Sequence, residues 1–133
     1  MQETHDLTAW TALLLGLFTL MAGLGAIRQP GIWRKMVEEI TASPTLQLLS
    51  GLIEMTLGAL VYLANPWMPS DLLACVMKAV GGFMMFEALA VAGFCDIYAH
   101  IWLRNLGVLD RRWAVVTALW GLGLTVAAFM RFT

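Results

Sequence analysis

Two acidic residues stand inside apolar stretches of this chain, where a charged side chain is costly. Glu54 lies within LSGLIEMTLGALVYL, and Glu87 lies within GGFMMFEALAVAG. An ionised carboxylate in hydrocarbon costs at least roughly 2.5–3.5 kcal/mol, so such groups face a protein interior or a wet cavity. We therefore expect at least one of the two carboxyl groups to be neutral at neutral pH. It either forms a hydrogen bond between helices or belongs to a proton or ligand site.

Four apolar segments must position these residues. They cover about residues 7–27, 45–64, 72–95 and 113–130, and each has about the 20 residues that cross a hydrocarbon core. The 133-residue chain is 60% hydrophobic and 13% charged, whereas an average soluble domain is about 45–50% apolar and 25% charged. So short a chain cannot bury that much apolar surface within itself. The sequence predicts an all-α fold, with residues 1–133 forming a single transmembrane domain, an integral membrane four-helix bundle.

The two carboxyl groups are predicted to lie at similar depths in this bundle. Glu54 stands about nine residues into the second span and Glu87 about eight residues before the end of the third, and a helix rises 1.5 Å per residue. Because consecutive spans run in opposite directions, the two depths differ by only a few ångströms, so the side chains can meet.

Basic residues indicate how the bundle is oriented. The second connection, ANPWMPSD, contains none, whereas the first and third connections contain Arg28, Arg34, Lys35, Arg104, Arg111 and Arg112. The positive-inside rule places these two connections in the cytoplasm and both chain termini on the outer side. We expect a multi-pass protein of a bacterial inner membrane. Arg131, near the C-terminus, argues mildly for the opposite orientation.

Two amphipathic segments follow the first and third spans. GIWRKMVEEI and DIYAHIWLRNL each place their apolar side chains on one helical face. We predict short amphipathic helices there, which either lie in the membrane interface or dock to a partner protein. The candidate residues for these contacts are Trp33, Arg34, Lys35, Tyr98, His100 and Trp102.

Helix starts are also visible in the sequence. Ser43 is the expected N-cap of the second span, with Pro44 at its first position. Ser70 or Asp71 is expected to cap the third span.

A weak internal repeat appears when the sequence is shifted by about 65 residues. The matches include Gly16 with Gly81, Phe18 with Phe83, Trp33 with Tyr98 and Gly58 with Gly123. Because each half crosses the membrane twice, the halves would form a parallel repeat about an axis along the membrane normal. The alternative is that any two apolar helical hairpins look alike.

The cysteines and histidines are too far apart to act in pairs. Twenty helical residues separate Cys75 from Cys95, about 30 Å, which no disulfide can bridge. His5 and His100 fall on opposite faces of the predicted membrane, so a bis-His haem within one subunit is not expected. No metal site, catalytic residue or catalytic motif is predicted. We predict no cofactor, although a quinone or pigment stays possible, and a net charge of −1 does not favour a nucleic-acid partner.

The segments GLFTLMAGLGAI, WRKMVEEI and LSGLIEMTLGALVYL resemble those of the DoxX-like small membrane proteins. The resemblance covers mainly the first half of the chain and includes the pattern Gly51, Glu54, Gly58. It implies a four-helix integral membrane protein, and some members are associated with oxidoreductase or quinone-linked complexes. Only Glu54 is carried over as a family-like position, without a known role.

Three functions remain open from the sequence. The leading hypothesis is a non-catalytic membrane component, a subunit or scaffold of a larger complex, with other membrane subunits or further copies of itself as partners. The first alternative is a small transporter or channel-forming oligomer that uses Glu54 and Glu87. The second is a quinone- or pigment-linked redox accessory subunit.

Overall fold

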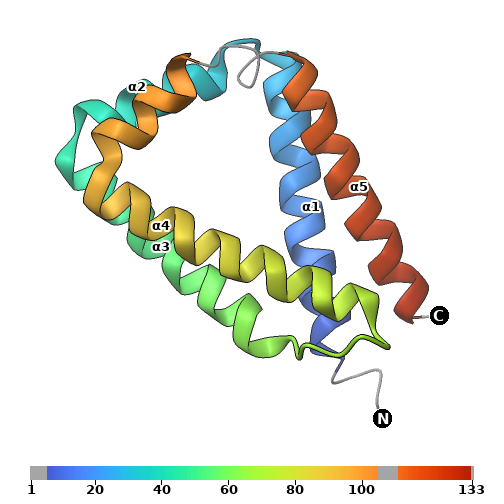
Figure 1. The fold of residues 1–133 in the computed structure, drawn as a ribbon. Coiled ribbons are helices and arrows are strands. Elements are labelled where there is room, and N and C mark those ends of the chain that lie inside the picture. The colour runs from blue at the N-terminus through green and yellow to red at the C-terminus, as the bar shows by residue number, and fades with distance from the viewer. Residues whose placement is uncertain (1–5, 105–110, 133) are drawn as a thin grey trace.

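The fold consists of helices, four of which can cross a membrane (Figure 1). The structure is a computed structural model that describes residues 6–104 and 111–132, and no strand occurs in these ranges. The helices are α1 (Leu7–Arg28), α2 (Ile32–Ala42), α3 (Pro44–Ala64), α4 (Leu72–Arg104) and α5 (Arg111–Phe132). All except α2 contain a segment that is long and apolar enough to span a bilayer. The predicted all-α fold with four membrane-spanning helices is confirmed.

The outer surface of these helices is strongly apolar. Many large side chains are more than half exposed, including Phe18, Leu63, Leu72 and Phe86 at 71–79%. A water-soluble protein rarely exposes apolar patches of such extent. This surface is therefore suited to lipid.

Capping side chains begin the helices at the expected places. The Ser43 hydroxyl accepts a hydrogen bond from the Leu46 backbone N–H at 3.3 Å, and Pro44 follows as the first helical residue. Asp71, rather than Ser70, caps α4, because its carboxylate accepts from the Ala74 N–H at 3.2 Å.

The two amphipathic segments differ in form. α2 is a separate helix that follows Gly31, whose φ of 88° lies in the left-handed region that glycine adopts readily. The segment after the third span is instead the end of α4, set off by a bend rather than a loop. The bend lies at Phe94, where the backbone leaves helical geometry (φ −136°, ψ 41°).

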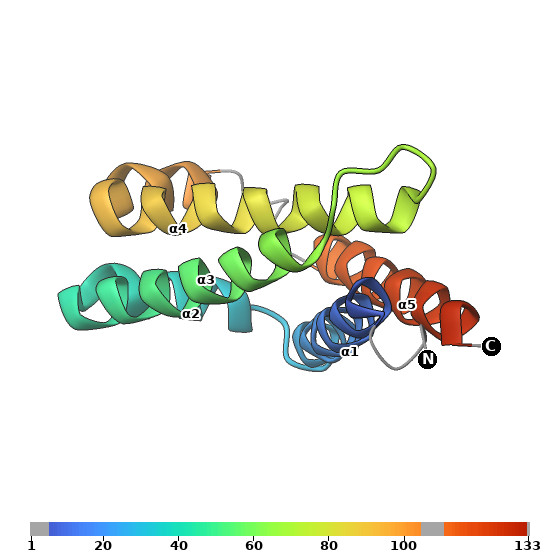
Figure 2. The same ribbon diagram turned by 90° about the horizontal axis from the view of Figure 1, so that it is seen from below.

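The spanning helices are arranged as two antiparallel pairs, α1 with α5 and α3 with α4. The pairs converge at the end of the molecule that carries both termini and diverge toward the end that carries α2 (Figures 1 and 2). Where they converge, all four spans contribute to one core cluster, and its Met77 is completely buried. The cluster consists of Ala12, Val61, Met77, Leu124 and Ala128.

Glycines bring the backbones within each pair into contact. A Cβ placed on Gly121 of α5 would lie 2.3 Å from the Leu20 nitrogen of α1. In the other pair, a Cβ on Gly81 of α4 would lie 2.6 Å from the Tyr62 nitrogen of α3. Small residues permit such close approach, which is how membrane helices gain packing energy.

These contacts follow a two-fold repeat. Gly16 lies against Gly121 in the first pair, and Gly81 lies against Gly58 in the second. The first half of the repeat contains α1 and α3, and the second half contains α4 and α5. The first helices of the two halves, α1 and α4, are thus related by the predicted shift of 65 residues. The second helices are related by 63 residues, so Gly58 corresponds to Gly121. The sequence match of Gly58 with Gly123 was wrong, since a Cβ on Gly123 meets no described atom within 4 Å.

A second contact along each pair agrees with this relation. Gly23 lies against Ala114 in the first pair, and its counterpart Ala88 lies against Gly51 in the second. α1 therefore corresponds to α4 and α3 to α5, as expected for a parallel repeat with an axis between the pairs.

Candidate functional site

A cavity of about 380 Å³ lies where α2 packs against α3 and α4, at the end where the two pairs diverge. Its wall is mostly apolar, with contributions from all three of these helices and from the start of α5. Its lining includes the side chains of Trp33, Glu54, Glu87, Cys95, Tyr98 and Trp113.

Glu54 and Glu87 both line this cavity, as their similar predicted depths allowed. Both are partly buried, line the same cavity and lie close enough to influence each other electrostatically. The Tyr98 hydroxyl donates a hydrogen bond to Glu87 Oε2. A hydrogen bond between two carboxyl groups requires a proton on one of them, because an ionised carboxylate can only accept. The arrangement can therefore hold and exchange a proton.

The α1–α5 pair packs closely without a carboxyl pair at the corresponding positions. Through the shifts of 65 and 63 residues, Glu87 corresponds to Ala22 and Glu54 to Thr117. The α1–α5 pair nevertheless packs tightly beside these positions, since a Cβ on Gly23 would lie 2.7 Å from the Ala118 nitrogen. The two carboxyl groups thus distinguish the α3–α4 pair from the α1–α5 pair.

The interfacial candidates divide into two groups. Trp33 and Tyr98, which are equivalent in the repeat, both line the cavity. Arg34 is exposed and forms an ion pair with Glu38 at 3.6 Å. Lys35 and His100 are likewise exposed, and the side chain of Trp102 lies outside the described residues.

The cysteines are both free and occupy different environments. Cys95 lines the cavity, whereas the Cys75 thiol donates to the Met68 carbonyl at 3.1 Å near the opposite end of α4. In residues 6–104 and 111–132, no group of three histidine, cysteine or acidic side chains could hold a metal ion. His5 lies outside the described residues.

Lys78, the basic residue within the third span, is satisfied far from the carboxyl pair. Its ammonium group donates to the Tyr62 carbonyl at 3.1 Å and lies 3.6 Å from the centre of the Tyr62 ring. These contacts combine a hydrogen bond with a cation–π interaction. Lys78 therefore links α4 to α3 and is not a partner of the carboxyl pair.

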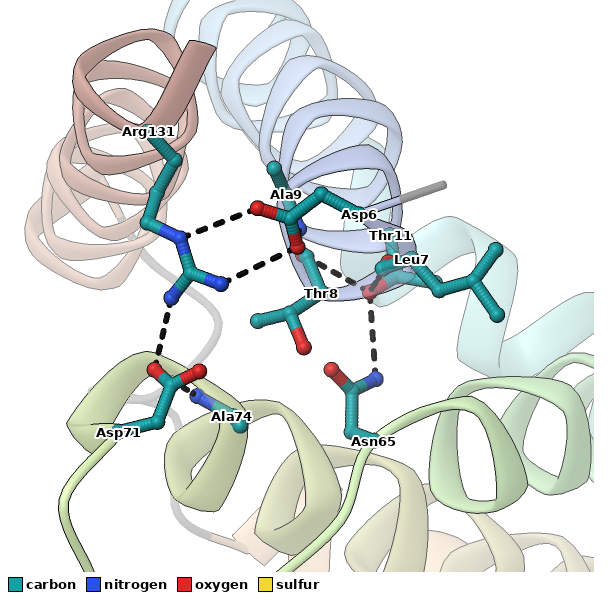
Figure 3. A network of polar contacts seen from close by, with 9 residues as sticks. All are labelled: Asp6, Leu7, Thr8, Ala9, Thr11, Asn65, Asp71, Ala74 and Arg131. Atoms are coloured by element: carbon teal, nitrogen blue, oxygen red, sulfur yellow. Dashed lines mark hydrogen bonds and ion pairs between the residues drawn. The ribbon is translucent and has the colours of Figure 1, made fainter. Parts of the chain in front are cut away.

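A second polar cluster, which was not predicted from the sequence, joins the pairs at the opposite end. Arg131 binds Asp71 through Nη1 at 2.7 Å and Asp6 through Nη2 at 3.1 Å and Nε at 3.2 Å (Figure 3). The two aspartates are repeat equivalents, 65 residues apart, and each caps its own helix. That equivalence is the sequence signal that could have revealed the cluster. Because Asp6 and Asp71 neutralise its charge at the same end of the bundle, Arg131 does not count against the orientation predicted by the positive-inside rule.

Asn65 extends this cluster toward α1. It is 1% exposed, and its amide donates to the Val61 carbonyl at 2.8 Å and to the Thr11 hydroxyl at 3.2 Å (Figure 3). The end of α3 is thereby tied to the first turns of α1.

The Arg131 cluster predicts a loss of stability in acid. The pKa of Asp71 is lowered, chiefly because the Arg131 guanidinium donates to its carboxylate, which outweighs the opposing effect of burial. Because the pKa of Asp71 is lower in the folded protein than its unfolded value of about 3.9, the contact stabilises the folded protein above that pH. This stabilisation is lost as the pH falls through the lower pKa of the folded state. We expect the unfolding temperature of the wild type in detergent to fall more between about pH 5 and pH 3 than that of Asp71→Asn. Equal decreases would contradict the pairing.

The relation of this chain to known proteins does not decide between the hypotheses above. No protein-family model, curated protein or solved structure matches the chain.

Proposed function

We propose that this multi-pass membrane protein binds a small molecule in the cavity of α2, α3 and α4, without catalysing a reaction on it. The observation that carries the proposal is the carboxyl pair. Glu54 and Glu87 line a cavity, and the equivalent positions in an equally close helix pair are Ala22 and Thr117. Polar groups inside a membrane that packing does not require are functional candidates.

The size and lining of the cavity support this proposal. Its volume of about 380 Å³ falls within the roughly 300–1,000 Å³ of small-molecule sites. Such sites have mostly apolar walls and a few polar groups that orient the ligand. Here Glu54, Glu87 and Tyr98 are those groups.

The cavity is proposed to lie toward the cytoplasm of a bacterial inner membrane. It is at the α2 end of the bundle, where Arg28, Arg34 and Lys35 are exposed. Cytoplasmic connections are enriched in such residues. Asp6 and Arg131 meet at the other end, so both termini would lie on the outer side.

Native mass spectrometry of protein purified in mild detergent tests the proposal. We expect one small molecule of defined mass bound to each wild-type chain. The Glu54→Gln/Glu87→Gln double variant should lose it, because the amides cannot supply a negative charge or a titratable proton. The matched control is Glu39→Gln, which removes a carboxylate from the exposed face of α2 and should retain the ligand. A bare chain in all three samples would count against a binding function.

A second candidate function is a subunit or scaffold within a larger membrane complex, in line with the resemblance to DoxX-like proteins. Gly123 and Ala127 favour it, because they line a mostly apolar groove of about 550 Å³ between α4 and α5, and a Cβ on Gly123 would meet no described atom within 4 Å. Small residues on a membrane helix commonly mark contact with another helix. The mass of the assembly extracted from native membranes tests this candidate, and a single chain without a partner would argue against it.

A further inference from the structure

We propose that the cavity of α2, α3 and α4 takes a small organic monocation, a substituted ammonium ion with an apolar body. This inference rests on the proposed function, since it names the chemical class of the molecule bound at the same site. The ammonium group would lie against the Glu54–Glu87 pair, and the aromatic side chains of Trp33, Tyr98 and Trp113 would surround it.

The charge of the cavity favours a cation. Its described titratable groups are Glu54 on α3 and Glu87, Cys95 and Tyr98 on α4. The described lining residues of α2 and α5 add no titratable group, and none of the described lining side chains is basic. The cavity can therefore be neutral or negative, and a monocation can replace a proton between the carboxyl groups.

The aromatic side chains favour an organic cation over a metal ion. Trp33 and Trp113 line the cavity together with Tyr98, whose hydroxyl donates a hydrogen bond to Glu87. Electron-rich ring faces attract ammonium groups, and aromatic cages bind quaternary ammonium ligands in this way. Calcium and magnesium ions instead require six or more oxygen ligands or bound water, which an apolar wall does not supply.

The apolar wall then accommodates the body of the ligand. The lining hydroxyls of Thr41 and Ser50 donate to backbone carbonyls of their own helices. The wall is formed by Met36, Val37 and Ile40 of α2 and Val91 of α4. These side chains are hydrocarbon or thioether, so they favour alkyl or aryl substituents on the nitrogen. A fully hydrophilic cation would gain nothing from them.

Two probes of the same shape, one charged and one neutral, separate the contribution of charge to binding from that of shape. Benzyltrimethylammonium is the cation, and neopentylbenzene is its neutral isostere, with carbon in place of nitrogen. Each is titrated into the full-length protein in detergent, and tryptophan fluorescence is recorded because Trp33 and Trp113 line the cavity. Protein-free micelles correct for partitioning of the probes.

We expect the cation to bind the wild type at least about tenfold more tightly than the isostere near pH 8. Its affinity should fall as the pH is lowered, because protons compete with the cation for the carboxyl pair. The Glu54→Gln/Glu87→Gln variant should lose both the preference and the pH dependence while still binding the isostere, which shows an intact cavity. The control Glu39→Gln should behave as the wild type.

Four outcomes would overturn the inference. Equal binding of the two probes, or cation binding that does not change with pH, would show that the carboxyl pair does not select a cation. Preferential binding of 2,3-dimethoxy-5-methylbenzoquinone would identify a quinone headgroup as the ligand, and the proposed binding function would stand. Binding of none of the three probes, with a bare chain in native mass spectrometry, would remove the proposed function itself.

Discussion

Gly121→Ala is expected to destabilise the protein by about 3 kcal/mol, at the upper end of the usual cost of overpacking. The added Cβ would lie 2.3 Å from the Leu20 nitrogen, 2.7 Å from the Gly16 oxygen and 2.8 Å from the Leu20 Cα. All three are backbone atoms, so no side chain can turn away to make room. α1 and α5 must separate, and the packing along the pair weakens with them. Unfolding of the purified protein in detergent, by heat or by titration with a denaturing detergent, measures the loss.

Gly123→Ala is the matched control, two residues further along the same helix. A Cβ there meets no described atom within 4 Å, and alanine is preferred over glycine in a helix by about 0.5–1 kcal/mol. This variant should therefore be as stable as the wild type or slightly more so. Gly81→Ala in the other pair should resemble Gly121→Ala, because its Cβ would lie 2.6 Å from the Tyr62 nitrogen. Equal stability of the 121 and 123 variants would show that α1 and α5 do not pack in this register.

Arg131→Met is expected to cost about 2 kcal/mol, somewhat less than the 3–5 kcal/mol for breaking a fully buried ion pair. The side chains are partly buried, with exposures of 31% for Arg131, 19% for Asp6 and 23% for Asp71. Without the guanidinium, the two carboxylates face each other without a neutralising charge. Because Asp6 caps α1 and Asp71 caps α4, the loss loosens the end where the two helix pairs converge. The same unfolding measurement applies.

Arg34→Met is the control for this variant. The Arg34–Glu38 pair is far more exposed, at 47% and 56%, and exposed pairs contribute at most about 1 kcal/mol. Asparagine at positions 6 and 71 should recover part of the stability of Arg131→Met, because it removes the repulsion between the carboxylates. An Arg131→Met protein as stable as Arg34→Met would show that Arg131 does not join the pairs.

The sequence by itself determined the spans and their starts, because these depend on local chemistry. About 20 apolar residues cross a bilayer regardless of what packs beside them, and Ser43 and Asp71 cap helices through bonds to residues three positions away. It also determined that Glu54 and Glu87 share a depth, since helical rise alone fixes that.

Only the tertiary structure decided which helices pair and which faces meet. A helix that is apolar all round carries no stripe that identifies its inner face, so α1 could have packed on α3 as readily as on α5. The matches of Gly16 with Gly81 and Trp33 with Tyr98 were visible in the sequence, whereas matching Gly58 to Gly123 was in error by two residues. Two residues turn a helix by about 200°, which moves a glycine from one face to nearly the opposite one.

The cavity and the Arg131 cluster depend on this pairing in the same way. Trp33 and Trp113 lie 80 positions apart in the chain, and Arg131 lies 125 positions from Asp6. No local propensity relates residues at such separations. They meet because backbone contacts at glycines set the register of each helix pair, and that register places every other side chain.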